Sequence, residues 1–530
     1  MDPLLQVLML VTGTATVAGL ARRYDLSPPI MLVAAGLALS YMPGVPAYHL
    51  DPDLVLVFFL PPLVYSAAVN SSLTAVRANA RPIALLSVGL VLFTALVVAV
   101  VARLVIPGLP WFAAVAFGAI LGPTDAVAAT AIARRVGLPA RIVTVLEGES
   151  LLNDATALVT LSVALKAAKS GHVTLLQIGA EAAVAVIGGT AVGLLSAYLI
   201  ARIRRLTNDS LIENTLSLLT PFLAYVPAAT IGASGVLAVV IAGLRLSHEA
   251  PVLLSPAARL QHQSIWSLID FLLESLLFAL IGLQLRDIVA HTGGHSSVDL
   301  AGAAVAVTAA VVLARFAWVF PATYLPRRLS PKLRARDPYP RWQTPAVISW
   351  AGMRGAVSLA AALSLPLVVH SRMPFPDRDV LIFLTLVAVV ASLLGQGFTL
   401  ARVVRWSGLR RDETQELLAE AAAQQRAASA ALVRLDELTA DGSTPDGVAE
   451  QLRQRAEFRQ LNAWERLGGG GGGTLGSEPP TAVYRRLRLQ MLGAERAAFL
   501  AMRDRGQITD DVLRRVQRDL DLEEAILARG

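Results

Sequence analysis

Long, nearly uninterrupted apolar runs recur along most of this chain, and they constrain its fold more than any other feature. A run of about 20 apolar residues is long enough for an α-helix to cross the hydrocarbon core of a bilayer. Hydrophobic residues make up 55% of the sequence and charged residues 16%, whereas soluble domains are usually about 45–50% apolar and about 25% charged. Because backbone polar groups must be satisfied internally in lipid, the sequence predicts an all-α polytopic membrane protein.

Thirteen transmembrane helices are predicted in residues 1–407, which we expect to form a membrane domain surrounded by lipid. They lie over 4–21, 29–42, 51–69, 82–105, 111–134, 141–167, 174–201, 211–226, 229–246, 265–286, 299–322, 344–369 and 379–404. Loops after odd-numbered helices carry about three times as many Lys and Arg residues as the other loops. Since basic loops remain in the cytoplasm, we expect a multi-pass protein of the cell (inner) membrane, with its N-terminus outside and its C-terminus in the cytoplasm.

The basic residues lie in short loops, so they indicate topology rather than a nucleic-acid surface, and we expect no nucleic-acid partner. The sequence contains no cysteine, which excludes disulfides and thiolate metal sites. No arrangement typical of a catalytic centre is present, so the sequence predicts neither an enzyme nor a bound cofactor.

Residues 408–530 differ in character from the preceding sequence. They are rich in charged residues and helix formers, as in "ETQELLAEAAAQQRAASAALVRLDEL". Gly468–Gly473 form an unbroken glycine run, which behaves as a flexible linker, and 480–528 predict two more helices. We therefore predict a cytoplasmic helical tail. A stabilising or dimerising role and a regulatory role both remain open, and the sequence does not identify a partner for the tail.

Two of the predicted helices contain polar interruptions near mid-span. The fifth helix includes "GPTD" at 122–125, and the twelfth includes "GMRG" at 352–355. Broken backbone at this depth is tolerated only where protein or a water-filled cavity covers it. The two helices are seven apart in order and therefore antiparallel, so helices 1–6 and 8–13 are predicted to form inverted repeats. Interrupted helices at matching positions of such repeats indicate a transport site.

Acidic, amide and hydroxyl side chains concentrate on the helix predicted over 141–167. Residues at i, i+3 and i+7 share one face of a helix. That face carries Glu147, Ser150 and Asp154, and the neighbouring face carries Glu149 and Asn153. Hard cations prefer oxygen ligands. A carboxylate that binds either a proton or a cation, but not both, would perform exchange.

"GPTDAVA", "EGESLLNDATALV" and "GMRGAVSLA" occur in this order, and with them the chain resembles the monovalent cation/proton antiporter-1 family, especially its bacterial Na⁺/H⁺ antiporters. The resemblance covers residues 10–405. It implies antiport of H⁺ against Na⁺, with Li⁺ or K⁺ as further possibilities. It also implies a homodimer in which a dimerisation subdomain supports a moving core, giving elevator-like alternating access.

The resemblance further implies roles for individual residues. Asp154 would be the carboxylate for which H⁺ and the cation compete. Asn153 would complete the Asn-Asp pair that accompanies electroneutral, one-for-one exchange. Ser150 and the backbone at Thr124 would help to ligate the monovalent cation, and Asp125 would face the ends of the broken helix.

Arg354 and Arg315 both lie inside predicted helices of the membrane domain. The resemblance implies that Arg354 pairs with Glu149, and Arg354 is also expected to hold the broken helix. Arg315 lies about two turns from the cytoplasmic end of its helix, so we predict that it extends its charged group to the membrane surface.

One position departs from the family pattern. Many relatives have an acid shortly after "PP" in the third helix, where it completes the ion site, but here Ser66 occupies the matching position. Asp270 and Glu274, four residues apart, are predicted either to line an inner funnel or to pair with a loop arginine. Glu147 is predicted to be either an acid on the access path or a structural residue.

Other functions remain open on the sequence alone. The same plan suits a K⁺/H⁺ antiporter regulated by its tail. A proton-coupled symporter of a small organic anion is less consistent with so many acids beside a single arginine. A channel or sensor would require a continuous polar pore lining, whereas the sequence shows one polar cluster.

Overall fold

A computed structural model describes most of the chain, and nearly all of the described residues are helical. The described residues are 3–24, 28–42, 55–125, 129–130, 132–133, 136–170, 175–207, 209–291, 296–369, 373–409, 413–440, 446–467, 480–505 and 507–528. The predicted linker Gly468–Gly473 lies outside them. The chain divides into two compact units, Met1–Arg411 and Asp412–Gly530.

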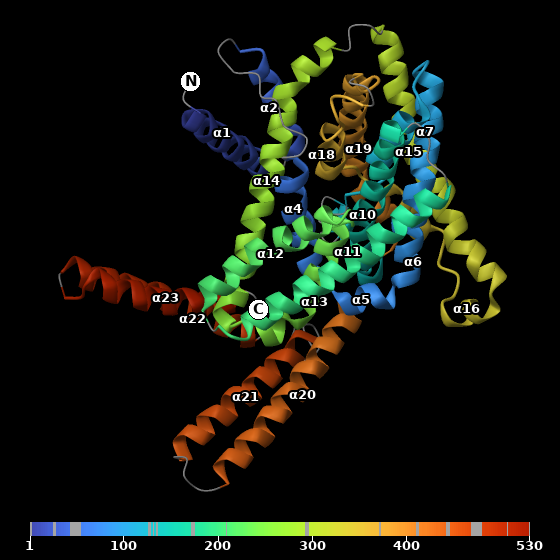
Figure 1. The fold of residues 1–530 in the computed structure, drawn as a ribbon. Coiled ribbons are helices and arrows are strands. Elements are labelled where there is room, and N and C mark those ends of the chain that lie inside the picture. Colours follow the sequence, from blue (N-terminus) through green and yellow to red (C-terminus); the bar gives the residue numbers. More distant parts are fainter. Residues whose placement is uncertain are drawn as a thin grey trace. The chain divides into compact units, whose positions relative to one another are not determined.

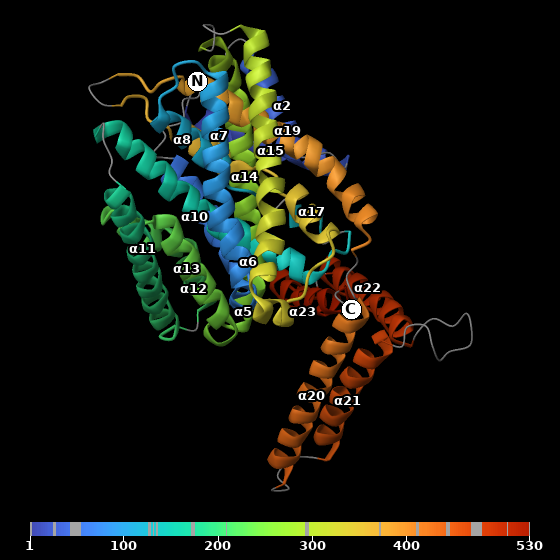
Figure 2. The same cartoon turned by 90° about the vertical axis from the view of Figure 1, so that its right-hand side faces the viewer.

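The first unit contains the apolar helices (Figures 1 and 2). In chain order they begin with α1 (Pro3–Arg23), α2 (Pro28–Ser40), η1 (Val55–Phe59), α4 (Leu60–Val69), α5 (Leu73–Ala78), α6 (Ala80–Ala84), η2 (Leu85–Leu90), α7 (Val91–Val105) and α8 (Trp111–Leu121). They continue with α10 (Ala140–Ser170), α11 (Leu175–Arg204), α12 (Ser210–Thr230), α13 (Gly235–Leu253), α14 (Pro256–His291), α15 (Ser297–Leu329), α16 (Pro331–Arg336), α17 (Gln343–Trp350), α18 (Ala356–Leu363) and α19 (Arg378–Ser407).

The described helices confirm a multi-pass, all-helical membrane protein. Seven of them are long and apolar enough to cross a bilayer, and three shorter apolar helices accompany them. Each predicted segment contains helix at the expected place. The count of thirteen spans and the inverted repeat stay predictions.

Several predicted boundaries are wrong, and those of α14 and α12 show the reason. α14 begins at Pro256 rather than at 265, because its first turns, "PAARLQHQS", are polar and lack the apolar signal on which the prediction depended. α12 continues through Pro227 to Thr230, and the chain turns instead at Gly232, where φ is +74°. A proline near the end of a helix removes only one backbone donor, whereas a positive φ suits glycine and interrupts the helix.

Small residues allow the helices of the first unit to pack closely. α14 lies beside α2 in both views (Figures 1 and 2). A Cβ atom at Gly36 would lie 2.5 Å from the carbonyl oxygen of Ala279, and one at Gly282 would lie 2.5 Å from that of Val33. Helix association in lipid depends on such close backbone approach, so these glycines fix the position of α14 against α2.

The second unit consists of two helical hairpins. α20 (Glu413–Thr439) packs against α21 (Asp446–Leu467), and α22 (Pro480–Asp504) packs against α23 (Asp510–Ala528). In the second hairpin, Arg488 donates hydrogen bonds of 2.6 and 2.7 Å to the two carboxylate oxygens of Glu523 and one of 2.8 Å to Glu495. These bonds lower the pKa of Glu523 and raise that of Arg488. The two helices predicted over 480–528 are present.

Candidate functional site

The two predicted helix interruptions exist and lie against each other. α8 ends at Leu121, and residues 351–355 separate α17 from α18. The backbone N–H of Asp125 donates a 2.8 Å hydrogen bond to the carbonyl of Met353. A Cβ atom at Gly355 would lie only 1.8 Å from Oδ2 of Asp125. Glycine at this position therefore allows the two interruptions to cross in direct backbone contact.

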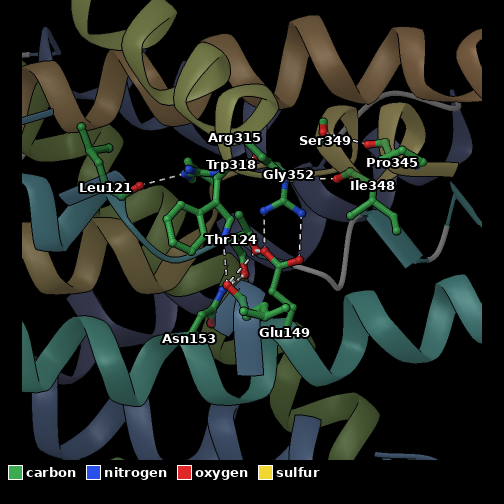
Figure 3. A network of polar contacts seen from close by, with 12 residues as sticks. Leu121, Thr124, Glu149, Asn153, Arg315, Trp318, Pro345, Ile348, Ser349 and Gly352 are labelled. Carbon is green, nitrogen blue, oxygen red and sulfur yellow. Dashed lines mark hydrogen bonds and ion pairs between the residues drawn. The ribbon is translucent and has the colours of Figure 1, made fainter. Parts of the chain in front are cut away.

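α10 presents the predicted polar residues to this crossing point. Asn153 is fully buried, and its amide nitrogen donates to the carbonyl of Thr124 at 3.0 Å and to its hydroxyl at 3.1 Å (Figure 3). Its amide oxygen has no hydrogen-bond partner in the described structure. Asp154, the next residue, is 7% exposed. Asn153 thus anchors α10 to the broken end of α8, next to the acid.

The partner predicted for Glu149 is wrong. Both oxygens of Glu149 accept from the guanidinium of Arg315, Nη2 lying 2.8 Å from Oε2, and the Thr124 hydroxyl donates to Oε1 at 2.8 Å (Figure 3). The described structure contains no ion pair between Glu149 and Arg354. Arg315 is 1% exposed, so the prediction that it reaches the membrane surface is wrong too. A fork-shaped pair of this kind satisfies both buried charges at once.

Arg354 instead binds the carbonyl groups that the helix breaks leave open. Its Nε donates to the carbonyl of Leu121 at 2.9 Å, and its Nη1 donates to that of Gly352 at 2.6 Å. Its backbone N–H donates to the hydroxyl of Ser392 at 3.0 Å. Carbonyls at a helix C-terminus lack helical partners and favour cations. Arg354 thus holds the broken helices, as predicted.

A cavity of about 410 Å³ lies beside the crossing point. Its lining includes eight of the residues that the sequence indicated: Ser66, Thr124, Asp125, Glu147, Ser150, Asp154, Asp270 and Glu274. The other three, Glu149, Asn153 and Arg354, lie outside the lining and support it. Among the described lining residues Arg22 is the single basic side chain. The cavity therefore combines carboxylate and hydroxyl oxygens with little positive charge, which suits a hard cation.

α14 contributes a contact that the sequence did not specify. The hydroxyl of Ser66 donates a 2.5 Å hydrogen bond to Oδ2 of Asp270. Two alternatives were open for Asp270, lining a funnel or pairing with a loop arginine. Asp270 lines the cavity, and no pair with a loop arginine is found among the described residues. Its contact with Ser66 joins α14 to α4.

Fold and cavity together define a class: a multi-pass helical membrane protein with a polar site where two interrupted helices cross. The sequence matches the family "Sodium/hydrogen exchanger, transmembrane" over residues 9–406. The chain belongs to this family, which confirms the resemblance in its motifs and makes it a transporter rather than an enzyme.

Individual relatives agree with the family match. A protein of Mycobacterium tuberculosis named "Uncharacterized Na(+)/H(+) exchanger" is 36% identical over 99% of this chain and 96% of the relative. The "Sodium, potassium, lithium and rubidium/H(+) antiporter" of Bacillus subtilis is 32% identical over 74% of this chain and 60% of the relative. The fold is similar to that of the sodium proton antiporter MjNhaP1 from Methanocaldococcus jannaschii, with a TM-score of 0.60 and 17% identity over 76% of this chain and 98% of that one.

Proposed function

We propose that the chain is a cation/proton antiporter in which H⁺ and Na⁺ compete for Asp154. The observation that carries the proposal is the cavity at the helix crossing, where Asp154 lies with the hydroxyl-bearing residues Ser150 and Thr124. A carboxylate with so little exposure to water favours either a proton or a bound cation. Because one carboxylate cannot hold both, release of one ion accompanies binding of the other.

Asn153 supports one-for-one, electroneutral exchange. It is buried beside Asp154, and its amide is committed to two hydrogen bonds with Thr124. An amide does not titrate, so this position adds no second exchangeable proton. With one proton and one monovalent cation alternating on Asp154, the net charge moved in a full cycle is zero.

We propose that the site alternates between the two sides of the membrane by an elevator-like movement of a core subdomain within a homodimer. The N-terminus would lie outside and the C-terminus in the cytoplasm of the cell. Such a cycle would couple ion homeostasis to pH regulation.

The transported cation is proposed to be Na⁺, with Li⁺ and K⁺ as alternatives. The M. tuberculosis relative is named for Na⁺, whereas the B. subtilis relative is named for Na⁺, K⁺, Li⁺ and Rb⁺. A K⁺/H⁺ antiporter regulated by the tail is the alternative within this class. An organic anion is disfavoured, because five carboxylates and one arginine line the described cavity.

Transport in inside-out vesicles with an imposed pH gradient tests the proposal. Addition of NaCl, LiCl or KCl should collapse the gradient in wild type, and Asp154→Asn should abolish the response. Glu181→Gln, which removes an acid outside the cavity, is the matched control and should retain it. If no cation collapses the gradient in wild type, or if Asp154→Asn behaves like wild type, antiport through Asp154 is refuted.

Electroneutrality requires a separate measurement. The exchange rate should not change when the membrane potential is clamped at different values with a potassium ionophore. A rate that follows the applied voltage would exclude one-for-one exchange while leaving antiport intact.

A further inference from the structure

The contact between Ser66 and Asp270 changes the composition of the ion site. We propose that Asp270 of α14 is a ligand of the transported cation and that Ser66 of α4 orients it. This proposal rests on the proposed antiport function. Together with Asp154 it would give the site two carboxylates from two different helices.

The geometry of this pair favours a ligand role. Ser66 is 1% exposed, and its hydroxyl is directed to Oδ2 of Asp270. The other oxygen, Oδ1, is buried and has no hydrogen-bond partner in the described part of the chain. A buried charged oxygen without a partner is costly. A cation bound at Oδ1 would supply the missing interaction.

The charges around Asp270 favour the same conclusion. Asp270 forms no ion pair among the described residues. Glu274 and Arg22 line the same cavity. When Asp270 and Glu274 are both ionised they repel each other, and a bound cation would reduce this repulsion.

The proposal also accounts for the serine at the position where an acid was expected on the third predicted helix. Ser66 and Asp270 touch, so a carboxylate is present at that point of the cavity although α4 does not carry it. The serine hydroxyl acts as the donor that fixes the orientation of the carboxylate. Ser66 is accordingly a positioning residue, and Asp270 carries the charge.

Glu274 provides a matched control for this role. It lies one turn further along α14, lines the same cavity and forms no hydrogen bond with Ser66 among the described contacts. If α14 only attracts cations through its negative charge, Asp270→Asn and Glu274→Gln should have similar effects. If Asp270 is a ligand, its replacement should raise the half-maximal cation concentration much more.

The experiment measures the half-maximal Na⁺, Li⁺ and K⁺ concentrations for gradient collapse in inside-out vesicles containing the full chain. For Asp270→Asn we expect an increase of about tenfold, with a maximal rate within about twofold of wild type. For Glu274→Gln we expect a change of less than about threefold. Equal effects of the two variants, or an Asp270→Asn value within twofold of wild type, would overturn the proposal.

A charge-relocation variant provides an independent test. Asp270→Ser removes the carboxylate, and Ser66→Glu combined with Asp270→Ser returns one to the opposite side of the same contact. We expect the double variant to recover to within about threefold of the wild-type cation concentration, whereas Asp270→Ser alone does not. A double variant no better than Asp270→Ser would show that the carboxylate has no role at this point of the cavity.

Controls separate this proposal from the function on which it rests. Size-exclusion chromatography in detergent shows which variants are folded. If Asp270 variants fail to fold, Ser66→Ala, which keeps the acid but removes its donor, should raise the half-maximal concentration about threefold, and an unchanged value would overturn the proposal. Transport by wild type that is lost in Asp154→Asn, together with unchanged Asp270 and Ser66 variants, would refute the role of Asp270 alone. Absence of wild-type transport would refute antiport itself.

Discussion

Replacing Arg315 tests which arginine neutralises Glu149, a buried acid of α10. Arg315 and Glu149 are each 1% exposed. The guanidinium donates to both carboxylate oxygens and, through Nε, to the carbonyl of Ile348 at 3.0 Å. In Arg315→Leu the carboxylate would keep only the 2.8 Å hydrogen bond from the Thr124 hydroxyl. The variant therefore leaves a nearly uncompensated charge inside the protein.

The magnitude follows from these contacts. Removing one partner of a buried ion pair typically destabilises a protein by about 3–5 kcal/mol, and losing the bond to Ile348 adds about 1 kcal/mol. We therefore expect Arg315→Leu to lower the free energy of unfolding by about 4–6 kcal/mol. Replacing Glu149 by Leu in the same chain removes the stranded charge. The double variant should be more stable than the sum of the two single changes predicts, by about 2 kcal/mol or more.

A pair of double-mutant cycles decides whether Arg315 or Arg354 pairs with Glu149. Unfolding in mixed detergent micelles with increasing dodecyl sulfate, followed by tryptophan fluorescence, gives the free energies. One cycle combines Glu149→Leu with Arg315→Leu, and the other combines it with Arg354→Leu. We expect the first coupling energy to exceed the second by at least about 1 kcal/mol. A coupling to Arg354 as large as that to Arg315 would refute the pairing and restore the one expected from the family resemblance.

Two further predictions concern the helix crossing and the tail. Gly355→Ala places a Cβ 1.8 Å from the carboxylate of Asp125, so it should reduce exchange at least about tenfold in vesicles and destabilise the protein by about 1–3 kcal/mol. The control Gly395→Ala has no neighbouring atom within 4 Å of its Cβ and should match wild type. A Gly355→Ala variant with wild-type exchange would contradict the close crossing. Bonding to Arg488 lowers the pKa of Glu523 in the folded hairpin of α22 and α23. The contribution of this pair to the stability of the hairpin is therefore present above the unfolded glutamate pKa of about 4.3. It is lost as the pH falls through the lower pKa of the folded state. Hydrogen exchange of α22 and α23 in the full chain, corrected for intrinsic rates, should therefore accelerate below about pH 4, and a wild type no more pH-sensitive than Arg488→Gln would contradict this.

The helical architecture could be predicted because lipid leaves the chain few alternatives. Apolar runs must form helices, and the motifs at 122–125 and 352–355 indicated where two of them break. The prediction failed where other signals prevailed. The polar first turns of α14 had no apolar pattern, and Pro227 is accommodated within α12. Sequence patterns therefore located the spans more reliably than their ends.

The lining of the cavity could also be predicted in large part, but the pairing of buried charges could not. Shared faces of α10 follow from helical periodicity, whereas the partner of Glu149 depends on how α15 is rotated and how deep it lies. The structure shows what allows Arg315 to reach it: a Cβ at Gly352 would lie 2.3 Å from both Cδ and Nε of Arg315. In the sequence, the motif that begins with Gly352 indicates only a helix break. The absence of a side chain at Gly352 also leaves space for a guanidinium, and this is the signal that could have identified Arg315 as the partner of Glu149.

The use of these two arginines determines the charge of the cavity. Arg315 is occupied by Glu149, and Arg354 is occupied by backbone carbonyls at the helix breaks. Neither side chain lines the cavity. Both contact residues next to it, Arg315 through Glu149 and Arg354 through the backbone at the helix breaks. Had Arg354 been directed into the cavity, it would have neutralised an acid there and favoured an anion. Because both positive charges serve the scaffold, neither neutralises an acid in the lining of the cavity, and this is the condition that the proposed competition between a proton and a cation at Asp154 requires.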